Sequence, residues 1–176
     1  RDNFNNLDIK QIYEDFADYN KVLETYKDLS SDDVEVAFMD LTFESSETAF
    51  DEAKDKNEKA KISDDVTYLM SACIDKFAKA LMFGGDYQEA WAEKFATTLE
   101  EAIDANPNNI PSILDSVLKI EKTAEFSNYG ILNTLTMHII NKHQKYAEKA
   151  LAAVDEHFAN YDKEVVEPKI ETYQES

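Results

Sequence analysis

The sequence of 176 residues contains very little cysteine, glycine, proline and histidine. A single Cys excludes an intramolecular disulfide. Three Gly and three Pro leave few residues for tight hairpin turns, which disfavours a sheet built from hairpins. The chain also lacks a glycine-rich phosphate loop, a Gly-x-Ser-x-Gly elbow and a Cys-x-x-Cys pair. These absences remove the usual sequence evidence for nucleotide binding, serine hydrolysis and thiol redox chemistry.

Positive charge is scarce as well. The chain has 37 Asp and Glu against 18 Lys and Arg, which gives a net charge of -19. Such a surface repels phosphate backbones and anionic lipids, so we expect no binding to nucleic acid or to membrane surfaces. No apolar run approaches the roughly 20 residues that a membrane span requires. Because 43% of the residues are hydrophobic, the chain is nevertheless apolar enough to fold.

Apolar residues recur at helical spacing along most of the chain, which predicts an all-α fold. We expect an irregular bundle of about six helices, forming one acidic domain over residues 1–176. The expected helices are a first at about 7–29, a second beginning at 30–33, a third from 63–65 to 84–85, a fourth over 86–105, a fifth beginning at 109 and a long C-terminal helix over 131–161. At 1.5 Å per residue, the last would be roughly 45 Å long.

Local signals set these boundaries. Ser63, followed by two Asp residues, offers a helix N-cap, whereas Gly84 and Pro107 favour helix ends. Trp91, Phe95, Leu99 and Ile103 are four residues apart and predict one buried face. Cys73 falls within a similar apolar pattern, so we expect a buried, unreactive thiol. The charged stretch over 51–61 predicts a solvated helix end or an exposed connection.

The sequence offers no catalytic or metal-binding motif. None of the three His residues follows a Glu by three positions, as the dimetal helical bundles require. His138 and His143 are five apart, which is not the i, i+4 spacing that places two imidazoles on one metal. The carboxylates are too numerous for any pair to be singled out. We therefore predict no enzyme activity, no cofactor and no metal site.

The leading functional hypothesis is a non-enzymatic binding protein with an acidic, tyrosine-bearing surface. Tyrosine beside carboxylates suits recognition of cationic groups, so we expect a basic protein partner. Because the chain begins at Arg1 rather than Met, we expect either a processed, secreted chain with an extracellular location or one module cut from a longer protein. The residues expected to contact the partner are Tyr13, Asp15, Asp18, Tyr19, Glu24 and Tyr26.

A second hypothesis is a carrier of an apolar small molecule or lipid. Aromatic residues on predicted core faces could line a cavity between the fourth helix and the C-terminal helix, since ligand pockets are mostly hydrophobic and aromatic. The same residues could instead fill a close-packed core. The residues expected at such a cavity are Phe77, Trp91, Phe95, Ile139 and Tyr146.

A third hypothesis is a structural module of a repetitive extracellular protein. One passage combines Gly84-Gly85-Asp86, Ala90-Trp91-Ala92, Phe95, Leu99 and an Asn109-Ile110 turn before Val117-Leu118. Over about a fifth of the chain, it resembles a helix-turn-helix passage in the helical modules of spider silk proteins. This chain is more charged and less serine-rich than those modules, and shared helical packing would also produce the resemblance. The resemblance implies a module that associates as pH falls toward the pI of 4.4.

Overall fold

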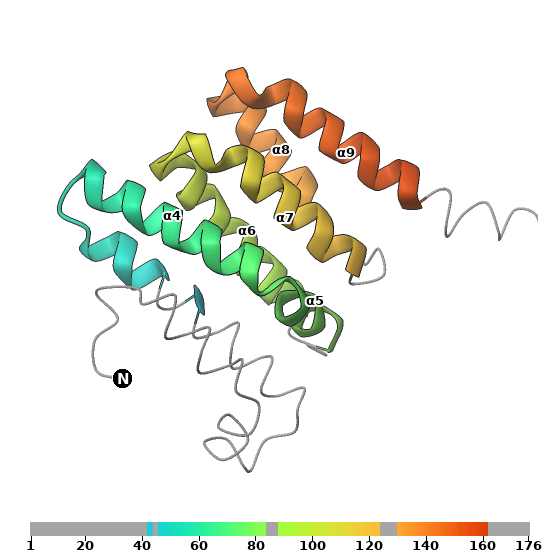
Figure 1. The fold of residues 1–176 in the computed structure, drawn as a ribbon, viewed down its shortest axis with the longest axis horizontal. Helices are drawn as coiled ribbons and strands as arrows, with labels where there is room; N and C mark the ends of the chain where they lie inside the picture. Colours follow the sequence, from blue (N-terminus) through green and yellow to red (C-terminus); the bar gives the residue numbers. More distant parts are fainter. Residues whose placement is uncertain (1–41, 44–45, 84–87, 124–129, 162–176) are drawn as a thin grey trace, which may run out of the picture.

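The computed structural model describes residues 42–43, 46–83, 88–123 and 130–161, and these form helices without strands (Figure 1). The predicted all-α class is confirmed. The predicted helices at 7–29 and after residue 30 lie outside the described residues, apart from helical turns at 46–52. The further helices are α4 (Lys56–Ala72), α5 (Ile74–Phe83), α6 (Gln88–Ala105), α7 (Ile110–Thr123), α8 (Ile131–Lys142) and α9 (Ala147–Tyr161), with short 3-10 turns η2 (Pro107–Asn109) and η3 (Gln144–Tyr146).

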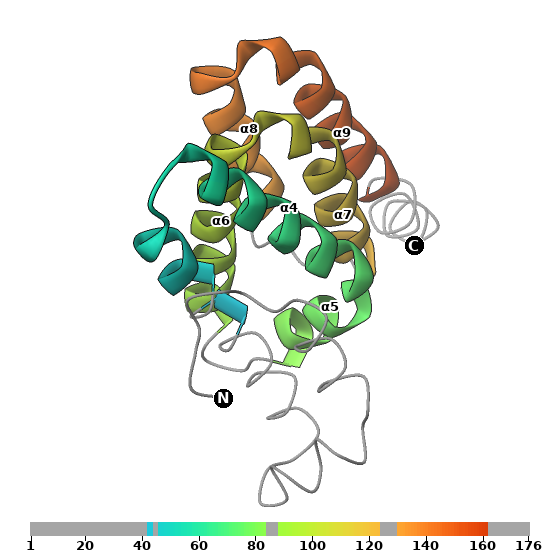
Figure 2. The ribbon, with the colours of Figure 1, turned by 60° about the vertical axis from the view of Figure 1, so that its left-hand side comes forward.

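The helices pack as a bundle in which contacts form both between consecutive helices and between helices that are distant in the sequence. Helix α4 lies against α6 and α7, α6 also contacts α8, and α9 packs on both α7 and α8. Figures 1 and 2 both place the turns at 46–52 on one side of the bundle and α9 on the other. None of the helices in the described part of the chain is long and apolar enough to cross a membrane.

The core is built from the apolar faces that helical spacing predicts. Phe95, Leu99 and Ile103 of α6 are all buried, as are Ile113 and Val117 of α7. Each such side chain contributes roughly 1.5–3 kcal/mol when it leaves water. The end predicted near Pro107 is also confirmed, because α6 ends at Ala105, whereas the end predicted at Gly84 lies outside the described residues. Cys73 is buried, as its apolar pattern predicts.

The predicted start of the third helix is wrong. Helix α4 begins at Lys56, where the Asp55 side chain accepts a hydrogen bond from the Glu58 amide at 2.9 Å. Ser63 therefore lies inside the helix, fully buried, and its hydroxyl donates to the Ala102 carbonyl on α6 at 2.6 Å. A serine that looks like an N-cap instead forms a contact between two helices. The helix also ends at Ala72 rather than continuing, and α5 runs in a new direction after Cys73 (Figure 1).

The predicted single helix over 131–161 is also wrong. His143 leaves the helical region, with φ -136° and ψ 58°, and separates α8 from α9. The chain then folds back so that α9 packs on α8 and α7. A straight helix would carry its last turns away from the bundle, whereas the reversal buries Ala150 and His157. Tyr146, in the η3 turn, donates its hydroxyl to Asn108 Oδ1 at 3.3 Å.

A buried carboxylate joins α7, α8 and α9. Glu121 of α7 is 2% exposed, and its Oε1 accepts a hydrogen bond from the Leu132 amide of α8 at 3.3 Å. Its Oε2 lies 3.6 Å from His157 Nε2 of α9. Burial raises the pKa of Glu121 to about 7, although hydrogen bonds from the Leu132 and Ile131 amides oppose the rise. Burial also lowers the pKa of His157, so both shifts favour uncharged groups.

Candidate functional site

Two of the predicted ligand residues lie at a small hollow among the described residues. Phe77 and Phe95 are buried and meet edge to face, with ring centroids 5.1 Å apart. They line a hollow of about 10 Å³, which is the room that one water molecule needs. Ile139 is buried and Tyr146 half-buried, but neither lines that hollow. Trp91 lies on α6, and its side chain is outside the described set. Phe77 and Phe95 therefore pack within the hydrophobic core.

The predicted partner surface lies in a different part of the chain. All six residues expected to contact the partner fall within 1–41, outside the described residues. That set is Tyr13, Asp15, Asp18, Tyr19, Glu24 and Tyr26. Their role in partner binding stays a prediction. The described residues form a separate acidic surface.

This surface is a groove between the helical turns at 46–52 and α6. It has a volume of about 450 Å³, within the range of small-ligand pockets, and we call it the acidic groove. Four carboxylates contribute to its walls, while a single cation, Lys94, is present among the described lining residues. The acidic groove is lined by Glu47, Asp51, Ala90, Glu93, Lys94, Thr97, Thr98 and Glu101.

Helix geometry explains why the carboxylates face one another. Glu47 and Asp51 are four residues apart on one wall, and Glu93, Thr97 and Glu101 follow the same spacing on α6. Residues four apart share a helix face, so each wall presents a stripe rather than scattered charges. The apolar neighbours Ala49 and Phe50 are buried on the other side of the first wall, which fixes its orientation. The groove therefore follows from two amphipathic helices packing with their polar edges adjacent.

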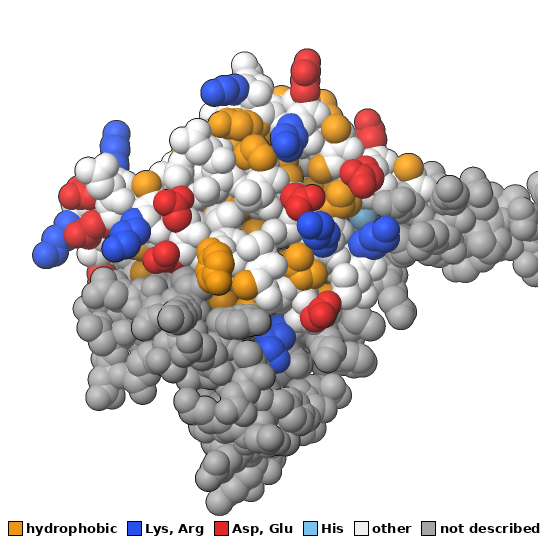
Figure 3. Space-filling model, in the orientation of Figure 1, with side chains coloured by type: hydrophobic (Ala, Val, Ile, Leu, Met, Phe, Trp, Pro, Cys, Tyr) orange, Lys and Arg blue, Asp and Glu red, His pale blue; other side chains and the backbone are white. Residues whose placement is uncertain are grey.

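The electrostatics of the acidic groove favour a positive ligand. Partial burial raises the pKa of Glu101, and the carboxylates of Asp51 and Glu47 raise it further, against an opposing effect of Lys59. The carboxylates of Asp51 and Glu47 thus make ionisation of Glu101 less favourable. A bound cation would relieve this repulsion. On the face shown in Figure 3, by contrast, acidic and basic side chains are interspersed over the described residues.

Sequence reasoning missed this site because it treated every carboxylate as part of a solvated face. The i, i+4 spacing of Glu93, Thr97 and Glu101 was visible in the sequence. The pairing of that stripe with Glu47 and Asp51, some 50 positions earlier, was not. A group that could hold a metal lies elsewhere in the described residues, at Asp104 of α6 and at His138 and His143 around the end of α8.

No protein-family model, curated protein or solved structure matches this chain. The geometry and charge of the described residues therefore carry the functional inference.

Proposed function

We propose that the protein is a binding protein that takes a lysine- or arginine-bearing segment of a basic protein partner into the acidic groove. The observation that carries the proposal is a concave surface with four carboxylates and one lysine among its described lining residues. Long cationic side chains suit such a groove, because their apolar stems can contact Ala90 while their charged ends reach the carboxylates. The net charge of -19 adds a long-range attraction that speeds encounter with a basic partner.

The proposal is tested with a fluorescently labelled hexalysine peptide and the full chain, by anisotropy at 0.05 and 0.15 M salt. The groove variant removes the four carboxylates as E47Q, D51N, E93Q and E101Q. At about 0.5 kcal/mol per lost charge pair, affinity should fall by about 2 kcal/mol, on the order of 30-fold in Kd. Binding to the wild-type chain should also weaken at the higher salt, because exposed charges are screened.

A matched control variant distinguishes the effect of the groove carboxylates on affinity from the effect of net charge. The surface control variant changes charge by the same four units through D75N, D115N, E148Q and D155N, all at exposed positions outside the groove. We expect this variant to lose much less affinity than the groove variant. Equal losses in the two variants would mean that net charge alone attracts the peptide, and wild-type binding that is insensitive to salt would contradict the electrostatic basis of the proposal.

The apolar carrier is a weaker candidate among the described residues. Phe77 and Phe95 pack against each other, and the hollow beside them holds about 10 Å³. Organic extraction of protein from its natural source, followed by mass spectrometry, tests the carrier directly: a recovered lipid or apolar molecule would support it.

A further inference from the structure

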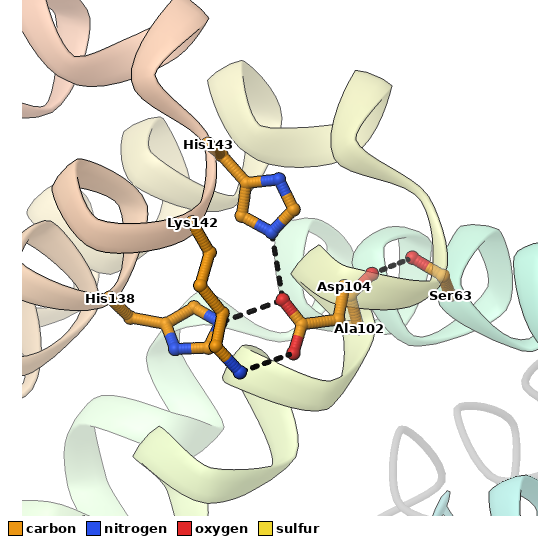
Figure 4. Close-up of polar contacts among 6 residues, drawn as sticks. All are labelled: Ser63, Ala102, Asp104, His138, Lys142 and His143. Atoms are coloured by element: carbon orange, nitrogen blue, oxygen red, sulfur yellow. Dashed lines mark hydrogen bonds and ion pairs between the residues drawn. The ribbon is translucent and has the colours of Figure 1, made fainter.

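Three side chains from separate elements converge at one end of the bundle (Figure 4). Asp104 lies in the last turn of α6, His138 in the second half of α8, and His143 directly after α8 ends. The Nε2 atoms of His138 and His143 lie 2.7 and 2.8 Å from the same oxygen, Asp104 Oδ1. Figure 4 shows both imidazole rings directed at this carboxylate, while Lys142 approaches the other oxygen at 3.9 Å.

The break in the helix after α8 brings the two imidazoles together. In a continuous helix, residues five apart are separated by about 140° around the axis, so their side chains diverge. At φ -136° and ψ 58°, His143 leaves that geometry, and its ring comes within 5.9 Å of the His138 ring, centroid to centroid. The five-residue spacing therefore does not keep the two imidazoles apart, because α8 ends before His143.

The end of α6 that carries Asp104 is held by α4. The Ser63 hydroxyl hydrogen-bonds the Ala102 carbonyl two residues before Asp104, as Figure 4 also shows. The side-chain amides of Asn106 and Asn109, which follow Asp104, donate to Asp64 Oδ1 at 2.9 and 2.8 Å. These bonds fix the end of α6. Positioning of this kind is what a preformed ligand set requires, because loose ligands must be ordered at the moment of binding.

We propose that Asp104, His138 and His143 bind one divalent transition-metal ion of the zinc class through a carboxylate oxygen and two imidazole nitrogens. The three ligand atoms lie within 4.8 Å of one another. Bonds of about 2.0–2.2 Å to nitrogen and oxygen place tetrahedral ligands about 3.3–3.5 Å apart, so small side-chain movements suffice. Two imidazoles and a carboxylate are a donor set that suits zinc and its neighbours better than magnesium or calcium.

The exposure of the ligands fits an ion that enters from solvent. The His138 and His143 side chains are 12% and 16% exposed, and that of Asp104 is 41% exposed. Three protein ligands leave at least one coordination position for water or for a group supplied by a partner. Lys142 pairs with the second carboxylate oxygen, which leaves Oδ1 directed at the imidazoles.

Without a metal, the same residues form a hydrogen-bonded cluster. Partial burial would raise the pKa of Asp104, but the hydrogen bonds from His143 and His138 outweigh burial and hold that pKa below its ordinary value. Metal binding replaces the proton at each Nε2 with the ion, so both imidazoles must be neutral and carry their remaining proton on Nδ1. A direct binding measurement distinguishes the two arrangements.

The first test uses the full chain, freed of metal by chelation, in titrations with Zn²⁺ by calorimetry and with Co²⁺ by visible absorption at neutral pH. We expect one saturable equivalent of each ion and Co²⁺ bands typical of four or five ligands. D104N, H138Q and H143Q should each weaken Zn²⁺ binding by at least about 10-fold, since even outer-shell changes cost 10–100-fold. No saturable equivalent, or unchanged binding in the His variants, would overturn the proposal.

Two controls test whether Zn²⁺ binds specifically at Asp104, His138 and His143. The surface control variant and the groove variant each remove four carboxylates but leave the three ligands intact, so both should retain the single equivalent. Zn²⁺ should move the ring NMR signals of His138 and His143 and leave those of His157 in place. Far-UV circular dichroism checks that each ligand variant folds, and D104N preserves the shape of the aspartate if a His variant does not. A shift at all three His residues would show non-specific binding and contradict the site.

Discussion

The buried Glu121 carboxylate leads to a prediction about stability. Its pKa is raised from 4.5 to about 7 in the folded protein, chiefly because the site is removed from water. Each unit is worth about 1.4 kcal/mol, so an ionised Glu121 destabilises the fold by about 3 kcal/mol relative to its protonated form. The variant Glu121→Gln removes the charge and keeps an oxygen that can accept from the Leu132 amide.

The sign of the pH dependence of stability follows from which state, folded or unfolded, binds the Glu121 proton more tightly. Because the pKa of Glu121 is higher in the folded state, the folded protein holds the proton over the interval from about 4.5 to about 7 while the unfolded chain does not. The stabilisation that Glu121 contributes is therefore fully present below pH 4.5 and lost as pH rises through 7. At pH 8, Glu121→Gln should be more stable than the wild type by up to about 3 kcal/mol, and the advantage should vanish near pH 4.5.

His157 changes stability with pH in the opposite direction to Glu121. Burial lowers its pKa, so the unfolded chain binds that proton more tightly and stability rises with pH until the unfolded imidazole has also titrated, near 6.5. The wild-type profile contains both contributions together with those of the surface carboxylates. The difference between wild type and Glu121→Gln isolates the Glu121 contribution, apart from its coupling to the imidazole 3.6 Å away.

The assay is urea unfolding of both proteins, followed by circular dichroism, at several values between pH 4.5 and 8. Glu148→Gln is the matched control, because Glu148 is exposed on α9 and its loss should change stability by no more than about 0.5 kcal/mol. If Glu121→Gln and the wild type differ in stability by the same amount at every pH, the pKa of Glu121 is the same in the folded and unfolded states, and burial does not raise it. If the loss caused by Glu121→Gln instead grows as pH rises, the ionised carboxylate stabilises the fold.

Substitutions of Ser63 and Gly130 test a contact between helices and a strained backbone position. Ser63→Ala removes the hydrogen bond to the Ala102 carbonyl and should cost about 1 kcal/mol by urea unfolding, whereas Ser71→Ala, at an exposed position on the same helix, should cost less than about 0.5 kcal/mol. Gly130→Ala should cost about 1 kcal/mol, because alanine is strained at φ 70°. A clash would not contribute to this loss, since the added Cβ would meet no atom within 4 Å. Gly130→Asn should recover part of that loss, because Asn tolerates this backbone region, and a loss equal to that of Ala would contradict the conformational explanation.

The parts of the fold that depend on local pattern are the parts that the sequence predicts well. The buried face of α6, with Phe95, Leu99 and Ile103, follows from spacing alone, and its end follows from Pro107. The start of α4 does not, because Asp55 and Ser63 both offer side chains suited to an N-cap. Only the packing of Ser63 against α6 decides between them, and that contact joins residues 39 positions apart.

The candidate sites could not be predicted from the sequence, because they also depend on contacts between distant residues. No glycine or proline marks the end of α8 at Lys142, so helical spacing continues through the break and suggests one long helix. The convergence of His143 and Asp104 depends on that break and on the packing of α8 against α6. The two walls of the acidic groove likewise meet only when the turns at 46–52 reach α6. Tertiary contacts, rather than local preferences, assemble both sites.

The burial of Cys73 gives this protein an internal reporter of local opening. It is the only thiol in the chain, is 4% exposed and lies at the junction between α4 and α5. A thiol reagent requires access to the thiolate, so labelling proceeds only when that junction separates from the core. When closing is faster than labelling, the observed rate measures the free energy of this one opening event. The dependence of that rate on denaturant then distinguishes a local separation of α4 and α5 from unfolding of the whole bundle, without any introduced label.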